Sequence, residues 1–158
     1  MTEYFKDNFL GGFVNTITAA AALLLAAIGF VISVYFSGVY YKWFSPEVFW
    51  MPQVCRLEEK TCLSVLDTPR AKIFGLPNSL LGIFVYAYAA LDVFFFPPYL
   101  GALLLGAACL RSVYLAYSLL FITKIPCKLC FASHAVNLAL FVIYLARVTA
   151  ALSGVPVS

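Results

Sequence analysis

The polar and apolar positions divide this chain into four long apolar stretches separated by polar segments. Charged residues are absent from the stretches between Asp7 and Lys42, Lys72 and Asp92, Asp92 and Arg111, and Lys128 and Arg147. A helix that crosses a bilayer needs about 20 mostly apolar residues, which is close to or below the length of each stretch. Because lipid offers the backbone no hydrogen-bond partners, we expect these spans to be helices.

The pattern therefore predicts an all-α integral membrane protein, a bundle of four transmembrane helices with a long loop between helices 1 and 2. We expect residues 1–158 to form a single membrane domain. Pro97 and Pro98 mark the turn between the second and third spans, because proline cannot continue a helix. We expect neither a cleavable signal peptide nor an appended thioredoxin-like domain. The expected spans are residues 15–37, 77–96, 99–123 and 127–151, with the loop at 38–75.

Composition agrees with a protein that is covered mostly by lipid. The chain is 64% hydrophobic and 11% charged, whereas soluble domains carry about 25% charged residues. Its net charge of +3 is small, and the basic residues are too scattered to indicate a nucleic-acid partner.

Four of the five cysteines fall on one side of the predicted bundle. An even number of spans places both termini on one side, so the long loop and the start of the fourth span share the other side. Cys109 differs, because it lies within the third span among apolar residues and is expected to be a packing residue. The four that share a side are Cys55, Cys62, Cys127 and Cys130.

Cys127 and Cys130 form a C-x-x-C motif that opens the fourth span. The positive end of the helix dipole and its free N–H groups stabilise a thiolate at this position, and Lys128 adds positive charge. A spacing of three residues places the sulfurs one turn apart, near enough to close a disulfide. The motif is therefore typical of a redox-active pair rather than of inert core cysteines.

Cys55 and Cys62, in the loop on the same side, suggest thiol–disulfide exchange between two cysteine pairs. One pair would then meet a partner protein and the other a membrane acceptor. Two alternatives stay open. The loop pair could be a structural disulfide, or all four cysteines could bind zinc, although structural zinc sites prefer pairs spaced by two to four residues.

Several segments resemble the vitamin K epoxide reductase family. Residues 73–82 read IFGLPNSLLG, similar to the family's segment that opens the second helix, and residues 112–117 read SVYLAY, similar to its third helix. Cys127 and Cys130 match the family's active-site motif, and Cys55 and Cys62 match its loop cysteines. The bacterial and archaeal members are quinone-dependent disulfide-forming enzymes.

The resemblance implies a quinone pocket beside Cys130, for a quinone of the menaquinone or ubiquinone type, and a separate thioredoxin-like protein as partner. It implies that Asn78 hydrogen-bonds a quinone oxygen and that Thr68 supplies the family's loop hydroxyl, where serine is usual. His134 stands where vertebrate members carry a tyrosine and could also donate to the quinone. From the residues alone, Asn78 could instead cap a helix and His134 could be a packing residue.

We therefore predict a membrane thiol oxidoreductase that passes electrons from a reduced thioredoxin-like protein through two cysteine pairs to a quinone, generating protein disulfides. The alternatives are vitamin K epoxide reduction and a non-catalytic membrane module with a structural disulfide or metal site. A C-x-x-C at a helix start favours the enzyme, because a structural module does not need it. His134 in place of the tyrosine favours quinone over epoxide.

Two charges within the spans need partners. A charge deep in a membrane costs about 2.5–3.5 kcal/mol and is usually paired. We hypothesise that Arg111 pairs with Asp92 and so joins the second and third helices. Alternatively, Arg111 lines the quinone pocket.

The basic residues also predict an orientation in the cell membrane. The opposite side has only Lys6 and Arg147, so the positive-inside rule places the cysteine side in the cytoplasm. Most of the family faces the other way, towards the compartment where disulfides normally form. The basic residues on the cysteine side are Lys42, Arg56, Lys60, Arg70, Lys72, Lys124 and Lys128.

Overall fold

Long helices dominate the computed structural model, which describes residues 2–43, 45, 68–73, 75–124 and 127–153, with the backbone alone for residues 2–15. Within these residues, four helices are long and apolar enough to cross a membrane, which confirms the predicted four-helix membrane fold. They are α1 (Thr2–Tyr40), α3 (Asn78–Phe95), α4 (Pro98–Tyr117) and α5 (Lys128–Leu152). The candidate spans within them are Thr16–Tyr40, Asn78–Phe95, Pro98–Thr123 and Lys128–Leu152.

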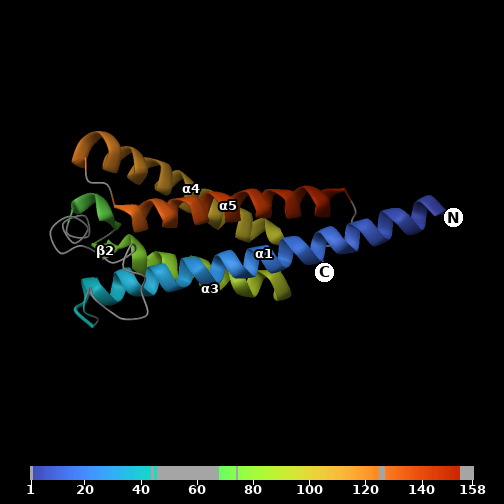
Figure 1. The fold of residues 1–158 in the computed structure, drawn as a ribbon, viewed down its shortest axis with the longest axis horizontal. Coiled ribbons are helices and arrows are strands. Elements are labelled where there is room, and N and C mark those ends of the chain that lie inside the picture. The colour runs from blue at the N-terminus through green and yellow to red at the C-terminus, as the bar shows by residue number, and fades with distance from the viewer. Residues whose placement is uncertain (1, 44, 46–67, 74, 125–126, 154–158) are drawn as a thin grey trace.

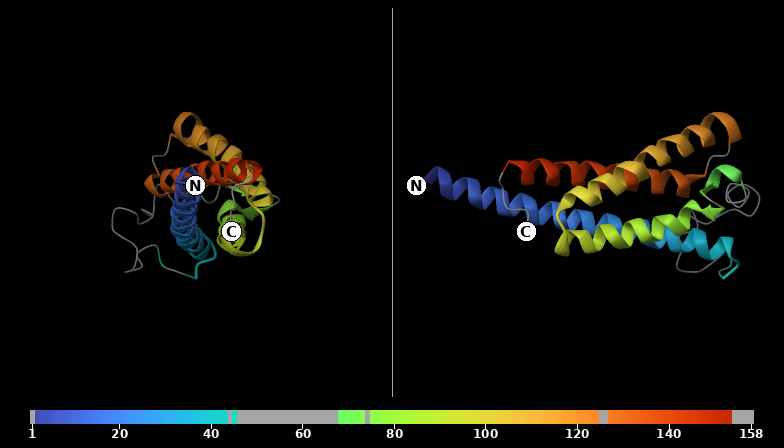
Figure 2. Two further views of the ribbon diagram at one scale, coloured as in Figure 1. Left: turned by 90° about the vertical axis from the view of Figure 1, so that its right-hand side faces the viewer. Right: turned by 180° about the vertical axis from the view of Figure 1, so that it is seen from behind.

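The helices alternate in direction (Figure 1). The end of α1 and the starts of α3 and α5 gather at one end of the bundle, which we name the cysteine end because Cys127 and Cys130 lie there. α1 packs along α3 and α5, and α4 packs along α5. α3 and α4 share a tight turn but separate towards the cysteine end, as Figure 2 shows. Residues of both helices line the cavity described below.

The last turns of α4 are wound as a π-helix, η3 (Ser118–Thr123). The Thr123 hydroxyl donates to the carbonyl oxygen of Ser118 at 3.1 Å, five residues earlier. Lys124 then adopts the left-handed backbone conformation, with φ at 53°, and ends the helix. π-helical turns are rare and occur frequently at functional sites. This one brings Ser118 and Leu119 against the cavity described below.

Large apolar side chains cover the outside of the bundle. Leu110 is 76% exposed, and Phe84, Leu103 and Phe95 are each at least 66% exposed. Exposure of this much apolar surface to water is unfavourable, whereas contact with apolar lipid tails is not. Small residues bring the helices together inside. A Cβ on Gly29 would overlap the Tyr86 ring, so this glycine allows α1 and α3 to approach closely.

A short hairpin leads into α3 at the cysteine end. It begins with the 3₁₀ turn η2 (Pro69–Ala71) and continues as the antiparallel strands β1 (Lys72–Ile73) and β2 (Leu76–Pro77). Gly75 between the strands has φ of 82°, a conformation that favours glycine. The loop cysteines Cys55 and Cys62 lie outside the described residues.

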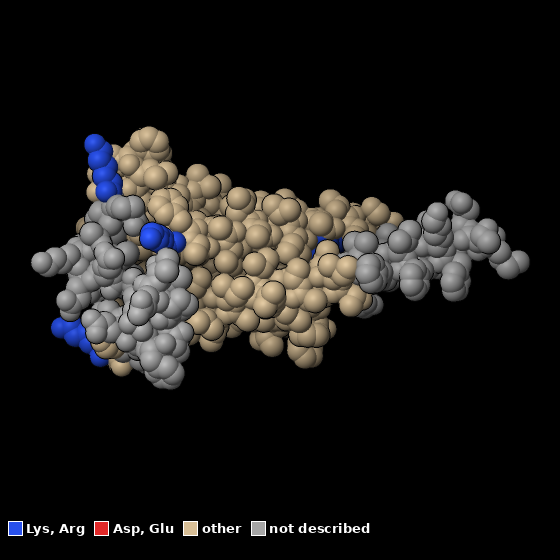
Figure 3. Space-filling view, in the orientation of Figure 1, with Lys and Arg blue, Asp and Glu red and all other residues tan. Residues whose placement is uncertain are grey.

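The hypothesis that Arg111 pairs with Asp92 is wrong. Asp92 lies beside Gly101, whose added Cβ would meet its Oδ2 atom at 2.7 Å. Arg111 is ten residues further along α4, which at 1.5 Å per residue places it about 15 Å nearer the cysteine end. The Asp92 carboxyl is fully buried and instead lies within electrostatic reach of Arg147 on α5. In Figure 3, blue lysine and arginine side chains gather at the cysteine end, and one small blue area lies farther along the bundle.

Candidate active site

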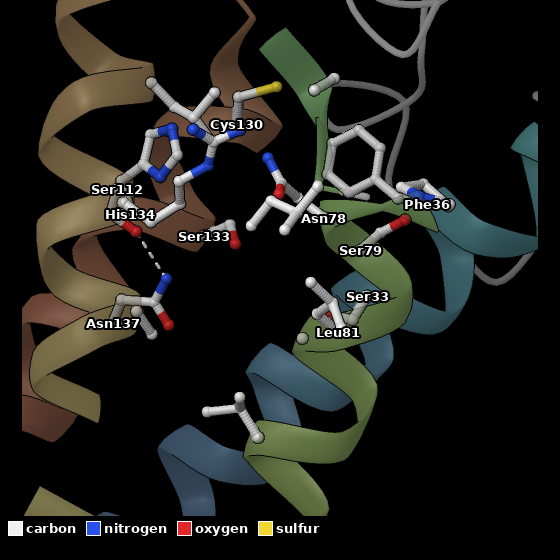
Figure 4. Close-up of a pocket in the computed structure, with 18 of the residues that line it drawn as sticks. Ser33, Phe36, Asn78, Ser79, Leu81, Ser112, Cys130, Ser133, His134 and Asn137 are labelled. Atoms are coloured by element: carbon white, nitrogen blue, oxygen red, sulfur yellow. Dashed lines mark hydrogen bonds between the residues drawn. The ribbon is translucent and has the colours of Figure 1, made fainter. Parts of the chain in front are cut away.

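A cavity of about 430 Å³ lies at the cysteine end, enclosed by α1, α3, α4 and α5 and bordered by the residues from Thr68 to Ile73. Most of the surface of its wall is apolar, and polar side chains are interspersed along it (Figure 4). Pockets for apolar cofactors and substrates have this composition. Its polar lining residues are Ser33, Thr68, Arg70, Asn78, Ser79, Tyr86, Arg111, Ser112, Ser118, Thr123, Cys130, Ser133, His134 and Asn137.

Cys127 and Cys130 meet at the start of α5. Cys127 is the N-cap residue, and its sulfur accepts a hydrogen bond from the backbone N–H of Cys130 at 3.3 Å. The two sulfur atoms lie 2.6 Å apart, so disulfide formation needs little movement. Cys130 lines the cavity. Cys127 has no exposed surface and packs in the core with Tyr35 and Leu119.

Asn78 is the first residue of α3 and lines the same cavity as Cys130. Both its side-chain nitrogen and its oxygen are buried, and neither has a hydrogen-bond partner among the described residues. Pro77 occupies the N-cap position, so Asn78 does not serve as the helix cap. A buried amide without partners costs free energy, about 1–3 kcal/mol, which a bound ligand could recover.

His134 and Thr68 border the cavity from two other elements. His134 follows Cys130 by one turn of α5, and within the described residues neither of its buried ring nitrogens has a hydrogen-bond partner. Its ring meets Phe131 edge-on, with the centroids 6.4 Å apart. Thr68 is the N-cap residue of η2, at the start of the segment that leads into the hairpin. The structure thus brings Cys130, Asn78, His134 and Thr68 to one cavity.

A hydrogen-bonded chain across three helices, which the sequence did not reveal, forms part of the cavity wall. The Tyr86 hydroxyl on α3 donates to the side-chain Oδ1 atom of Asn137 on α5 at 2.7 Å. The Asn137 amide then donates to the Ser112 hydroxyl on α4 at 2.6 Å (Figure 4). One signal was available, because Cys130, His134 and Asn137 follow the i, i+4, i+7 spacing of one helix face.

Arg111 also lines the cavity, as the alternative to its pairing with Asp92 required. Its Nη2 atom donates to the carbonyl oxygen of Arg70 at 2.6 Å and lies 3.4 Å from that of Lys72. Its guanidinium also lies over the Tyr114 ring, 5.1 Å from the centroid. Arg111 therefore places a cation at the cavity wall, in contact with backbone carbonyls.

The sequence pattern of the vitamin K epoxide reductase family matches residues 20–145, most of the chain. The chain belongs to this family. The match runs from within α1 to near the end of α5, and it includes the cavity and both cysteines of the C-x-x-C motif. A comparison with curated protein sequences gave no match.

Vitamin K epoxide reductase family proteins are membrane-embedded oxidoreductases that act on quinone-type substrates. A redox-capable cysteine pair beside an apolar cavity within the membrane region agrees with that chemistry. No group of three or more His, Cys, Asp or Glu residues that could hold a metal ion occurs in the described part of the chain.

Proposed function

We propose that this protein is a thiol oxidoreductase that passes electrons from a reduced thioredoxin-like protein, through two cysteine pairs, to a quinone, and so generates protein disulfides. The observation that carries the proposal is the position of Cys130. Its sulfur borders a largely apolar cavity that also contains Asn78 and His134, two buried polar side chains without partners among the described residues. Family membership makes the protein an oxidoreductase, and this geometry supports a quinone as the electron acceptor.

The C-x-x-C pair supplies the electrons in this proposal. Oxidation of the Cys127 and Cys130 thiols forms one S–S bond and releases two electrons and two protons. Reduction of one quinone to quinol consumes the same number of each, so no other reactant is needed. Cys127 lies at the N-terminus of α5. This position stabilises the thiolate that is required for exchange with a second dithiol.

The polarity of the cavity suits a quinone. A quinone has an apolar ring with two carbonyl oxygens that accept hydrogen bonds. The Asn78 amide and an N–H of His134 could donate to those oxygens, which would satisfy both buried groups. The lipid-exposed Phe84 of α3 also borders the cavity, so an apolar tail could leave between α3 and α4. The Thr68 hydroxyl offers a further polar contact at the border.

Cys55 and Cys62 complete the proposed relay. Their disulfide would accept electrons from the thioredoxin-like partner, and the resulting loop thiols would reduce the Cys127–Cys130 disulfide. The hairpin that follows this loop borders the cavity, which supports a loop attached near the C-x-x-C pair. We treat residues 1–158 as one membrane domain in which both cysteine pairs serve the same cavity.

We further propose that the cysteine end faces the cytoplasm. Of the two cations expected on the opposite side, Arg147 is only 3% exposed and lies near Asp92, so it is not a freely exposed loop charge. A reporter that matures on only one side of the membrane, fused to Ser158, tests the orientation. A cytoplasmic C-terminus would contradict this part of the proposal.

The direct test of the function is quinone reduction by the purified protein with a dithiol donor. Cys130→Ala should abolish turnover, and Cys109→Ala, a matched change in a cysteine outside the cavity lining, should leave turnover intact. Absence of turnover in the wild type would instead support a non-catalytic membrane module. Reduction of an epoxide but not of a quinone would reassign the substrate.

A further inference from the structure

Arg111 makes contacts that join α4 to the segment between the cysteine loop and α3. Its Nη2 atom donates to the backbone carbonyl of Arg70 at 2.6 Å and lies 3.4 Å from that of Lys72. These two carbonyls belong to η2 and β1, about forty positions earlier in the chain. One side chain thus connects a membrane helix with the hairpin segment.

The segment that Arg111 holds forms one border of the cavity. Thr68, Arg70, Ala71 and Ile73 all line the cavity from this side. Its own secondary structure is slight, consisting of one 3₁₀ turn and a two-residue strand paired with Leu76 and Pro77. A segment with so few backbone hydrogen bonds needs side-chain contacts to keep its position.

An arginine suits this role better than a lysine. Its Nη2 atom carries two N–H groups held in the guanidinium plane and reaches both carbonyls, whereas a lysine ammonium is a flexible point charge. The Arg111 guanidinium is also positioned over the Tyr114 ring of the same helix, 5.1 Å from the centroid. Stacking on an aromatic ring restricts the orientation of the fork.

We propose that Arg111 is a positioning residue that holds residues 68–73 over the cavity, so that the segment closes the quinone site. The effect on quinone binding rests on the function proposed above, whereas the effect on the segment itself does not. Loss of Arg111 should open the border of the cavity and weaken quinone binding. The cysteine chemistry should change less, because Arg111 contacts the Arg70 and Lys72 carbonyls and the Tyr114 ring, which lie outside the C-x-x-C motif.

Backbone hydrogen–deuterium exchange in lipid nanodiscs tests the positioning role without reference to activity. In Arg111→Gln, amides of residues 70–73 should exchange about tenfold faster, equivalent to about 1.4 kcal/mol of lost closure. Arg111→Lys should show a smaller increase. The control is Lys124→Asn, which also removes a positive charge at the cysteine end. Lys124 is exposed and lies outside the cavity lining. Asparagine tolerates the left-handed backbone conformation of this position.

Steady-state kinetics supply the second readout. The KM for a short-chain ubiquinone analogue should rise about tenfold in Arg111→Gln, with kcat changed less than threefold and partial recovery in Arg111→Lys. Unchanged exchange at residues 70–73 in a folded Arg111→Gln protein would overturn the proposal, as would faster exchange throughout the bundle. Should Arg111→Gln not fold, unchanged exchange in Arg111→Lys would overturn it equally. If wild type reduces no quinone, the proposed function fails, while the exchange data still decide the role of Arg111.

Discussion

Removal of the Asp92 charge should destabilise the bundle through Arg147 and not through Arg111. Asp92 has no exposed surface, Arg147 has only 3%, and the two side chains lie within electrostatic reach without a direct hydrogen bond between them. When one member of a buried charge pair is removed, the other charge remains uncompensated, which typically costs 3–5 kcal/mol. Arg147 would keep its contact with the Val93 carbonyl at 3.4 Å and with the Tyr144 ring at 5.3 Å. We therefore expect Asp92→Asn to lower the free energy of unfolding by about 3 kcal/mol, near the lower end of that range.

Two double-mutant cycles assign the partner of Asp92. Unfolding by detergent denaturation should show that Asp92→Asn and Arg147→Gln are coupled by at least about 1 kcal/mol, because both changes disrupt one interaction. Asp92→Asn and Arg111→Gln should add within about 0.5 kcal/mol, as expected for sites this far apart. The reasoning is refuted if the first cycle is additive or if Asp92 couples to Arg111.

Four further substitutions test the cavity and the packing beside it. Asn78→Leu should raise the KM for quinone about three- to tenfold through loss of one hydrogen bond, while the unfolding free energy stays equal or rises because a buried amide without a partner is removed. Tyr86→Phe should lower the free energy of unfolding by about 0.6 kcal/mol, a typical value for one hydrogen bond between membrane helices. Asn137→Leu should lower it by about twice that, because Asn137 makes two such bonds. Equal losses in the two variants would contradict this assignment. Gly29→Ala should lower stability by about 1–3 kcal/mol through overpacking against Tyr86, and an unchanged denaturation curve would show that α1 and α3 adjust freely.

The spans could be predicted from the sequence because lipid imposes one simple requirement. Helices within a bilayer carry few charges, so the stretches between charged residues marked all four spans. Each candidate span begins and ends within a few residues of its expected position, although α1 itself begins earlier, at Thr2. The C-x-x-C geometry followed from position for a similar reason. A cysteine at a helix start can accept backbone N–H groups, and the Cys127 sulfur accepts that of Cys130.

The partners of the buried charges could not be predicted in the same way. Arg111 contacts backbone carbonyls, which leave no trace in the sequence. The predicted partner of Asp92 was on the next helix along the chain, whereas Arg147, its neighbour in the structure, lies on α5. Which helices meet depends on small residues such as Gly29 and Gly101, whose contacts appear only in three dimensions. The hydrogen-bonded chain from Tyr86 through Asn137 to Ser112 could not be predicted for the same reason.

The central claim is that Cys130 delivers electrons to a quinone, and a single-turnover experiment tests it most directly. A Cys55→Ser, Cys62→Ser, Cys109→Ser background leaves only the C-x-x-C pair. After reduction and removal of excess reductant, this protein in nanodiscs is mixed with a ubiquinone analogue, and quinol and remaining thiols are counted. We predict one quinol and one Cys127–Cys130 disulfide per protein, and no quinol when Cys130→Ser is added. Equal quinol formation after that change, or quinol formation without loss of thiols, would contradict the claim.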